Sequence, residues 1–459
     1  MEREVKRYTR TNVVLLSVLA LSLLLRLCYI FSEPNEFPVL RDGHHYVSIA
    51  ENLRANHSYE DSYAGTDRGL HPLFSDISPT AFWLPGYPFF LSFVFTVFGT
   101  SPRTVYVLQA LMSVVAVFIC FRSAGLLFKS RSALTAAALM GISPYQIFYT
   151  RQILTEGLSS LVLVSTVYVT LKIARSLRER EHWPLGLTLA LALVLSVGVL
   201  TREVFASVAL GTFLWVALLC ANKSRTGKKR GSALEPDFSP SIKRAGNRFS
   251  ALKPLLYPSF LFLLVVLLVS PWFVRNYRIW GKAIYETKMG LNMYMGFNDR
   301  ATGSIDIESV PYLDPKKYDE VTRDEIYKAW ALGWMAKHPV RSSTLFLKKL
   351  LLLYNPVPTS PGSTKLIGLV WWLFLLSLAG VGIVFGLRNM ERFQYLYIVL
   401  IFYTLPHGLA FGAIRFRVPL EVILILFATL GVDAITRIRN LAGGSSKSLA
   451  PIAQPRRGL

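Results

Sequence analysis

The 459-residue chain is poor in acidic residues and in cysteine. It contains 28 Asp and Glu against 50 Lys and Arg, a formal net charge of +22, and three cysteines, Cys28, Cys120 and Cys220. The cysteines lie far apart inside apolar segments, a pattern typical of small buried residues that argues against a disulfide framework or a zinc site. The basic residues are concentrated between apolar segments and carry no RNA-binding signature, so their distribution indicates membrane topology and anionic lipid contact rather than nucleic acid.

Several sequence motifs of soluble enzymes are also missing. The chain has no Walker A sequence, no Gly-x-Gly-x-x-Gly fingerprint, no Gly-x-Ser-x-Gly elbow and no His-Glu-x-x-His pattern. It has no short-period repeat, which argues against a solenoid. These absences argue against a soluble active site that uses a nucleotide.

Long apolar segments dominate the sequence, in which 52% of residues are hydrophobic and 13% aromatic. Because a helix needs about 20 apolar residues to cross a bilayer, the sequence predicts an all-α polytopic membrane protein with about ten transmembrane helices. The first segment has no small-residue cleavage site after it, so we expect a retained anchor. The ten expected spans are residues 13–31, 104–128, 132–149, 157–171, 184–200, 205–221, 255–273, 366–387, 393–410 and 418–435.

One apolar segment, residues 80–99, leaves the topology open. Pro85, Gly86 and Pro88 interrupt it, and the uninterrupted part, 89–99, would be about 17 Å of helix. If the segment spans the membrane, the most basic linker falls outside the cell. If it lies at the outer interface or re-enters, every basic segment faces the cytoplasm, as the positive-inside rule requires. We take the second arrangement, with both termini cytoplasmic.

This topology divides the chain into a cytoplasmic N-terminus (1–12), a transmembrane domain (13–436) and a basic cytoplasmic tail (437–459). Within the domain we expect two exterior loops, 32–103 and 274–365, and a disordered basic cytoplasmic linker, 222–253. The linker has nine Lys or Arg against two acidic residues.

The second exterior loop contains two amphipathic segments, 318–337 and 340–354. The second segment is expected to lie on the membrane as a helix. Its apolar face would consist of Leu345, Phe346, Leu350, Leu353 and Tyr354.

Charged residues gather at the exterior ends of the expected spans, where positive charge is normally scarce. Ionisable residues at membrane depth are costly, and function is the default hypothesis for them. Since guanidinium groups bind phosphate oxygens in pairs, the candidate ligands of a lipid-linked phosphate are Arg202, Arg275, Arg415 and Arg417. The alternatives are an ion pair between Arg202 and Glu203 and snorkelling of Arg415 and Arg417 to lipid headgroups.

Two carboxylates are candidates for chemistry. Asp42, within the polar cluster Arg41–Tyr46 after the first span, is the candidate general base that accepts an acceptor's proton, and its alternative role is a helix N-cap. Glu156 would shape the acceptor site or share a divalent metal with Asp42, unless it only complements a helix dipole. Whether a metal is needed stays open.

Supporting roles are expected for His44, Tyr46 and His407. Adjacent histidines such as His44 and His45 point in different directions, which favours hydrogen bonding over metal ligation.

In their order along the chain, six segments resemble the GT-C superfamily of polyprenyl-phosphate-sugar glycosyltransferases. They most resemble the bacterial proteins of family 39, grouped with dolichyl-phosphate-mannose–protein mannosyltransferases. The segments are Asp42–Tyr46, Leu84–Pro88 leading to Phe98-Gly99, Ser143-Pro144 before Thr155-Glu156, Pro271–Tyr277, Gly290–Gly296 and Arg415–Pro419.

The resemblance implies a multi-pass protein of the bacterial cytoplasmic (inner) membrane with its active site on the exoplasmic side. Asp42 would be the first-loop catalytic aspartate of a single inverting displacement. The donor would be a polyprenyl-phosphate-linked sugar and the acceptor a protein, lipid or glycan. Gly43 stands where the eukaryotic enzymes have Glu, and their large lumenal domain is not expected, so the sugar (hexose, mannose-like, or pentose) and the acceptor stay open.

The alternative from another class is a transporter, or a flippase of lipid-linked saccharides without transferase activity. A transporter typically has broken helices in paired repeats and charges near the membrane midplane. Here the span interiors are nearly free of charge and the unusual residues gather on one side. This distribution favours an interfacial enzyme.

Overall fold

The computed structural model describes residues 2–36, 41–62, 79–179, 184–231, 240–356 and 364–442, and these residues form helices and connecting segments. Within them there is no β-strand, only an isolated bridge between Glu60 and Pro79. The expected all-α fold is confirmed. The helices of the first half are α1 (Glu2–Phe31), α2 (Arg41–Asn56), α3 (Gly86–Phe98), α4 (Pro102–Leu127), α5 (Ser130–Ile142), α6 (Pro144–Phe148), α7 (Glu156–Glu179), α8 (Leu185–Thr201) and α9 (Val204–Gly231).

The second half continues the helical pattern with several short 3-10 turns. Its α-helices are α10 (Pro240–Trp280), α11 (Met289–Gly296), α12 (Glu320–Lys337), α13 (Pro339–Tyr354), α14 (Thr364–Gly386), α15 (Met390–Thr404) and α16 (Glu421–Ala442). The 3-10 helices within the described residues are η2 (Tyr149–Arg151), η3 (Ile307–Ser309), η4 (Leu387–Asn389), η5 (Leu405–Gly408) and η6 (Ile414–Arg417).

Six helical segments in the described part of the chain are long and apolar enough to cross a membrane. They are Thr9–Phe31, Pro102–Leu127, Glu156–Glu179, Val204–Asn222, Leu256–Trp280 and Leu366–Gly408, the last of which covers most of α14 and all of α15. The chain is therefore a polytopic integral membrane protein. The exact number of ten spans stays a prediction.

Two apolar helices are shorter than these six, α3 with 13 residues and α8 with 17. Helix α3 corresponds to about 20 Å, which is less than the ~30 Å hydrocarbon core. It begins at Gly86, directly after the turn at Pro85, so Gly86 and Pro88, two of the three residues expected to interrupt segment 80–99, lie in its first turn. Its placement at the membrane surface stays a prediction.

The expected span over residues 132–149 is not one helix. Helix α5 ends at Ile142, and Pro144 begins α6, because a proline inside the helix would remove a backbone hydrogen bond. The Ser143 side chain accepts a hydrogen bond from the backbone N–H of Gln146 at 3.2 Å. Arg26 of α1, fully buried, donates to the Gly141 carbonyl at 2.8 Å. The Arg26 guanidinium therefore donates a hydrogen bond to a carbonyl near the break between α5 and α6.

Close packing between α14 and α16 depends on two glycines. A Cβ at Gly382 would meet the carbonyl oxygen of Phe427, and a Cβ at Gly431 would meet that of Leu378. Small residues at such positions let helix backbones approach closely in a membrane.

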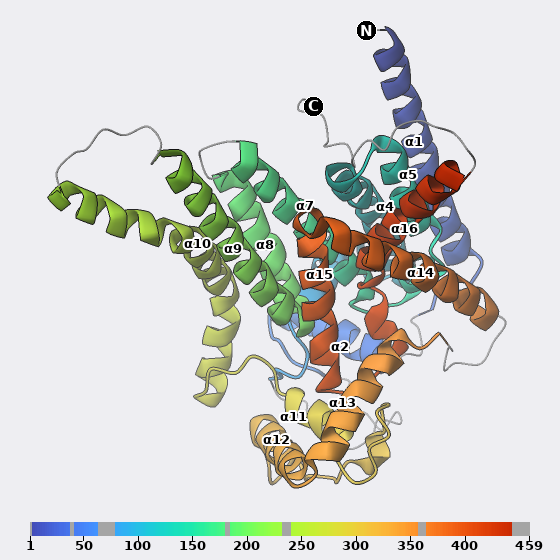
Figure 1. Ribbon diagram of the computed structural model, residues 1–459. Coiled ribbons are helices and arrows are strands. Elements are labelled where there is room, and N and C mark those ends of the chain that lie inside the picture. Colours follow the sequence, from blue (N-terminus) through green and yellow to red (C-terminus); the bar gives the residue numbers. More distant parts are fainter. Residues whose placement is uncertain are drawn as a thin grey trace.

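Helices from both expected exterior segments lie at one end of the bundle. Figure 1 shows α2, α11, α12 and α13 at the end opposite the start of α1. Helices α9 and α10 extend into the basic segment 222–253 that we expected to be disordered, and residues 232–239 lie outside the described residues.

Helix α13 has the expected amphipathic character. Leu345 and Leu353 are buried, while Leu347 and Leu351 are exposed. The buried face also contains Lys349, which the sequence did not lead us to expect there. The position of α13 on the membrane stays a prediction.

Candidate active site

Asp42 lies in the first turn of α2, which begins at Arg41. It therefore sits inside the helix rather than before it as an N-cap, in a position where the helix dipole favours a carboxylate. The next residue, Gly43, packs against the turn that precedes α7: a Cβ there would lie 3.1 Å from the carbonyl oxygen of Ile153. The small residue lets α2 approach the start of α7, where Glu156 is the first residue.

Arg415 reaches Asp42 from the other end of the sequence. Its Nη1 lies 2.6 Å from Asp42 Oδ2, and both side chains keep about a quarter to a third of their surface exposed (26% for Asp42 and 30% for Arg415). Burial disfavours the carboxylate, but Arg415, with smaller contributions from Lys288 and His45, holds the pKa of Asp42 below its usual value. Asp42 is therefore ionised and remains partly exposed.

A second ion pair joins Glu156 to Arg202. Arg202 Nη1 lies 3.4 Å from Glu156 Oε1, and the two side chains are 9% and 3% exposed. Glu156 Oε2 and Arg202 Nη1 have no hydrogen-bond partner. Arg202 and Glu203 form the turn between α8 and α9, so both side chains project from the end of that helix pair. The ion pair between Arg202 and Glu203, the alternative to phosphate binding, does not form, since Arg202 contacts Glu156 and Glu203 contacts Lys288.

The two pairs act on one another. Burial disfavours the charge on Arg415, but Asp42 and then Glu156 outweigh it and raise the pKa of Arg415. The pKa of Arg202 is raised in the same manner, with burial opposed first by Glu156. Four of the predicted residues, from α2, α7, the α8–α9 turn and η6, therefore form one charged site, which we call the paired-charge site: Asp42, Glu156, Arg202 and Arg415.

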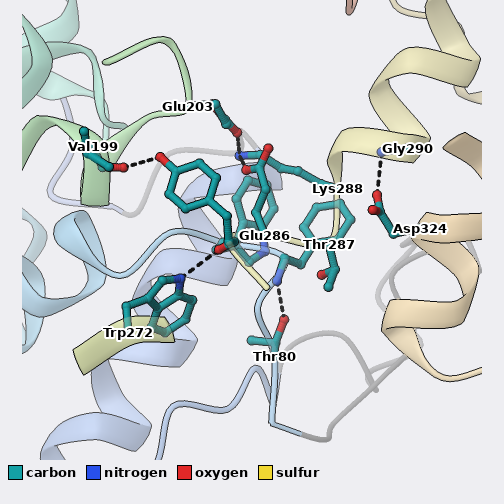
Figure 2. Close-up of polar contacts among 12 residues, drawn as sticks. Thr80, Val199, Glu203, Trp272, Glu286, Thr287, Lys288, Gly290 and Asp324 are labelled. Carbon is teal, nitrogen blue, oxygen red and sulfur yellow. Dashed lines mark hydrogen bonds and ion pairs between the residues drawn. The ribbon is translucent and has the colours of Figure 1, made fainter. Parts of the chain in front are cut away.

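A third charged group, which the sequence did not indicate, lies beside this site. Figure 2 shows Lys288 between Glu203 and Glu286. Its Nζ forms an ion pair with Glu203 and lies 3.8 Å from Glu286 Oε2. It also lies 5.2 Å from the centre of the Trp83 ring. Burial disfavours the charged form of Lys288, but the carboxylates of Glu203 and Glu286 outweigh the effect of burial and raise the pKa of Lys288.

The other two predicted arginines have different contacts. Arg275 donates to the backbone carbonyls of Thr80 at 2.7 Å and Tyr59 at 3.0 Å, and it lies over the rings of Tyr59, Trp272 and Trp280.

Arg417 donates to the Asn355 carbonyl and, at 2.6 Å, to the Tyr145 hydroxyl, and it lies 3.9 Å from the Trp372 ring centre. In a 3-10 helix each residue turns by about 120°, so Arg415 and Arg417 of η6 point in different directions.

Two of the predicted supporting residues, Tyr46 and His407, lie within electrostatic reach of the paired-charge site. Tyr46 is buried edge-on against the rings of Trp83 and Tyr87. His407, also buried, forms a hydrogen bond with the Tyr403 carbonyl at 2.8 Å and stacks on the Tyr403 ring. His44 is half-buried on α2.

The neighbouring His45 contacts a residue that the sequence did not single out. Its ring hydrogen-bonds to Asp61, which follows α2 in the chain. Among the described residues, no group of three or more His, Cys, Asp and Glu side chains lies close enough to hold a metal ion.

The geometry of the site suits an anion that carries hydrogen-bond acceptors. Arg202 and Arg415 each face a carboxylate, and guanidinium groups bind phosphate oxygens in the same manner as carboxylate oxygens. Asp42 is ionised and partly exposed beside them, as a general base must be.

Comparison with known proteins places these residues in a family context. Residues 78–234 match the model of the dolichyl-phosphate-mannose-protein mannosyltransferase family. The chain resembles this family. The matched segment runs from before α3 to the end of α9 and includes Glu156 and Arg202. The resemblance expected from the sequence is thereby confirmed, while Asp42 and Arg415 lie outside the matched residues. No curated protein sequence matches the chain.

Three solved structures are similar to the chain to different degrees. The apo oligosaccharyltransferase of Archaeoglobus fulgidus is similar with a TM-score of 0.50 and 14% identity, covering 96% of this chain and 53% of its own. The same organism's AglB in complex with an inhibitory peptide and a dolichol-phosphate has a TM-score of 0.49 at 14% identity, covering 95% and 52%. ArnT from Cupriavidus metallidurans bound to undecaprenyl phosphate has a TM-score of 0.34 at 14% identity, covering 97% and 81%.

The chain thus spans about half the length of the oligosaccharyltransferase structures that it matches (52–53%). The similarity to the apo enzyme concerns the fold, which is a GT-C-like membrane fold as the sequence predicted.

Proposed function

We propose that this protein is a glycosyltransferase of the membrane that moves a sugar from a polyprenyl-phosphate carrier to an acceptor outside the cytoplasm. The observation that carries the proposal is the contact of 2.6 Å between Asp42 and Arg415 next to the pair of Glu156 and Arg202. The family match over residues 78–234 and the apolar helices around the site support the same conclusion.

In the proposed reaction, the acceptor oxygen attacks the anomeric carbon of the donor sugar. A bond forms between that oxygen and the anomeric carbon, and the bond from the carbon to the phosphate oxygen breaks. The electron pair stays on the phosphate, and Asp42 takes the acceptor's proton. A single displacement of this kind inverts the configuration at the anomeric carbon.

The two arginines act on the leaving group. Arg415 and Arg202 would hold the phosphate oxygens and stabilise the charge that develops as the bond breaks. When Arg415 turns to the phosphate, the Asp42 carboxylate loses part of its ion pair and becomes a stronger base. Glu156, whose Oε2 is buried without a hydrogen-bond partner, would orient the acceptor.

The remaining assignments of the proposal concern substrates and topology. The sugar is a hexose, mannose-like, or a pentose, and the acceptor is a protein, lipid or glycan. The active site would face the exoplasmic side of a bacterial cytoplasmic membrane, because the basic segments then face the cytoplasm. The end of the bundle that holds α2 and α11–α13 in Figure 1 would be the outer end.

Replacing the proposed base tests the function. The reconstituted protein is supplied with radiolabelled undecaprenyl-phosphate-linked mannose, glucose, galactose or arabinose, with envelope membranes as the acceptor source, and the label that leaves the donor is counted. We expect transfer by the parent from at least one donor. Asp42→Asn should lower the rate about 10²- to 10⁴-fold, the usual contribution of a general base.

Glu325→Gln provides the matched control. It makes the same carboxylate-to-amide change at an exposed ion pair with Lys282 on α12, at the same end of the molecule, and should leave the rate unchanged. Full transfer by Asp42→Asn would overturn the assignment of the base. Failure of the parent with all four donors would overturn the proposed function.

A further inference from the structure

Glu203, Glu286 and Lys288 form a charged cluster that has no role in the proposed reaction. Its three members come from two elements far apart in sequence: Glu203 from the α8–α9 turn, and Glu286 and Lys288 from the segment before α11. Figure 2 shows that the side chains of Glu203 and Glu286 both point toward Lys288.

The segment that carries Glu286 and Lys288 is held firmly on both sides. Trp272 Nε1 donates to the Tyr285 carbonyl at 2.7 Å, and the Tyr285 hydroxyl donates to the Val199 carbonyl. The Thr287 N–H donates to the Ala81 carbonyl at 3.3 Å. The charged side chains are therefore positioned by contacts with three separate parts of the chain.

One oxygen in this group accepts no hydrogen bond, although the side chains of Glu286 and Glu203 also interact with each other. Glu286 is 8% exposed, and its Oε2 accepts no hydrogen bond although it is buried. A buried polar atom without a partner costs free energy, so such atoms mark places where a ligand or water belongs. The nearest cation, Lys288, is 3.8 Å away and is already engaged by Glu203.

The charge of the group argues for a neutral ligand. Burial and the neighbouring carboxylate of Glu203 raise the pKa of Glu286 well above its usual value, which favours the protonated form of Glu286. The negative charge of Glu203 and the positive charge of Lys288 then sum to zero. A carboxylate, a carboxylic acid and an ammonium together donate and accept hydrogen bonds without net charge, which suits hydroxyl groups and not a phosphate.

The group is also close enough to the reacting centre. Lys288 lowers the pKa of Asp42, and Glu203 directly follows Arg202 in the chain. A ligand whose phosphate is held by Arg202 and Arg415 would therefore place its sugar ring near Glu203, Glu286 and Lys288.

We propose that Glu203, Lys288 and Glu286 form the subsite that recognises hydroxyl groups of the transferred sugar and selects among sugars on the same carrier. This inference rests on the proposed function and adds which residues decide the donor sugar. The phosphate is held by the arginines, and the sugar is chosen by the neutral group beside them.

The test compares the best of the four undecaprenyl-phosphate donors with its monodeoxy analogues. The parent should prefer the complete sugar at least tenfold in kcat/KM over the analogue that lacks the recognised hydroxyl. Glu286→Leu and Lys288→Met should lower that ratio at least tenfold, since they remove the group that hydrogen-bonds to it. Glu286→Gln, which keeps a donor and an acceptor as the protonated acid does, should keep the ratio within about threefold.

Controls come from the exposed ion pair of Lys282 and Glu325, in which Lys282→Met and Glu325→Gln should leave the ratio unchanged. A general loss of folding would lower kcat/KM for both donors by the same factor. That outcome for Glu286→Leu and Lys288→Met overturns the subsite and leaves the proposed function standing. A parent that transfers none of the four sugars overturns the proposed function, and this inference with it.

Discussion

Arg202 and Arg415 differ from Arg275 and Arg417 in what their guanidinium groups contact, although all four lie at the same kind of position in the sequence. Arg202 and Arg415 each face a carboxylate from another element. Arg275 and Arg417 bind backbone carbonyls and lie over aromatic rings.

The difference separates exchangeable contacts from structural ones. A carboxylate partner can be replaced by a phosphate oxygen, which carries the same charge and accepts the same hydrogen bonds. A carbonyl cannot be replaced without breaking a connection between elements: Arg275 joins α10 to the segment at Thr80, and Arg417 joins η6 to the end of α13. We therefore propose Arg202 and Arg415 as phosphate ligands and Arg275 and Arg417 as structural residues.

The largest effect is expected from removing an exchangeable arginine. Arg415→Met should lower kcat/KM for the donor about 10²- to 10³-fold, because a charge that stabilises the leaving phosphate is lost. Thermal unfolding in detergent should change little, since Asp42 keeps partial access to solvent. Arg278→Met, which changes an exposed arginine of α10, is the matched control and should keep full activity.

The pH profile of the same variant sharpens the assignment. Asp42 acts as a base only when it is ionised, so activity falls as the pH falls through its pKa. In the parent, Arg415 holds that pKa below the usual value, and its removal should raise it. The acidic limb of kcat/KM should therefore move to higher pH in Arg415→Met. An unmoved limb would show that another group titrates.

Replacing a structural arginine should lower the stability of the protein, in contrast to Arg415→Met, which should lower its activity. Arg417 is 1% exposed, and Arg417→Met would leave the Tyr145 hydroxyl and the Asn355 carbonyl without this donor. We expect a loss of about 2–3 kcal/mol in the free energy of unfolding, the usual cost of leaving buried polar groups unpaired. Thermal unfolding in detergent measures it. If Arg417→Met instead kept its stability and lost activity as Arg415→Met does, the comparison between the two kinds of arginine would fail.

Much of the fold could be predicted because it depends on local patterns. Apolar segments of sufficient length gave the helices, and the spacing of Leu345 and Leu353 gave the buried face of α13. The break between α5 and α6 was visible as Pro144. Its compensation by Arg26 was not, because that contact joins residues 115 positions apart.

In the site, too, single residues could be predicted from the sequence, but their contacts could not. Asp42, Glu156, Arg202 and Arg415 were identifiable because charges at span ends are unusual. Their pairing was not, since it depends on how η6 and α8 meet α2 and α7.

Lys288 and Glu286 could not be predicted as site residues because they lie in a polar loop, where charged residues are common. Their spacing of two residues was the available signal, since such residues share a face in extended chain. Their partner, Glu203, could be found only from the tertiary structure.

Lys349 tests whether a buried cation that contacts a ring and a carbonyl has a structural role, and the expected effect is smaller than for Arg417. Like Arg417 it is fully buried and contacts a ring and a carbonyl: its Nζ lies 3.2 Å from the centre of Phe297 and donates to the Gly408 carbonyl at 3.3 Å. Unlike an arginine, it can lose its charge, and burial lowers the pKa of Lys349 to about 7. The unfolded chain keeps a lysine pKa of about 10.4.

The sign of the pH dependence follows from these two values. Below pH 7 the lysine is protonated in both states, and the cost of burying its charge is fully present. As the pH rises above 7 the folded protein releases the proton while the unfolded chain keeps it, so stability increases by at most about 1.4 kcal/mol per pH unit. Lys349→Met should thus be more stable than the parent near pH 6, and the gap in Tm should narrow toward pH 9, whereas Lys348→Met, an exposed neighbour on α13, should follow the parent. Parallel curves for Lys349→Met and the parent would mean that Lys349 stays charged, and its contacts would then resemble those of Arg417 in charge as well as in geometry.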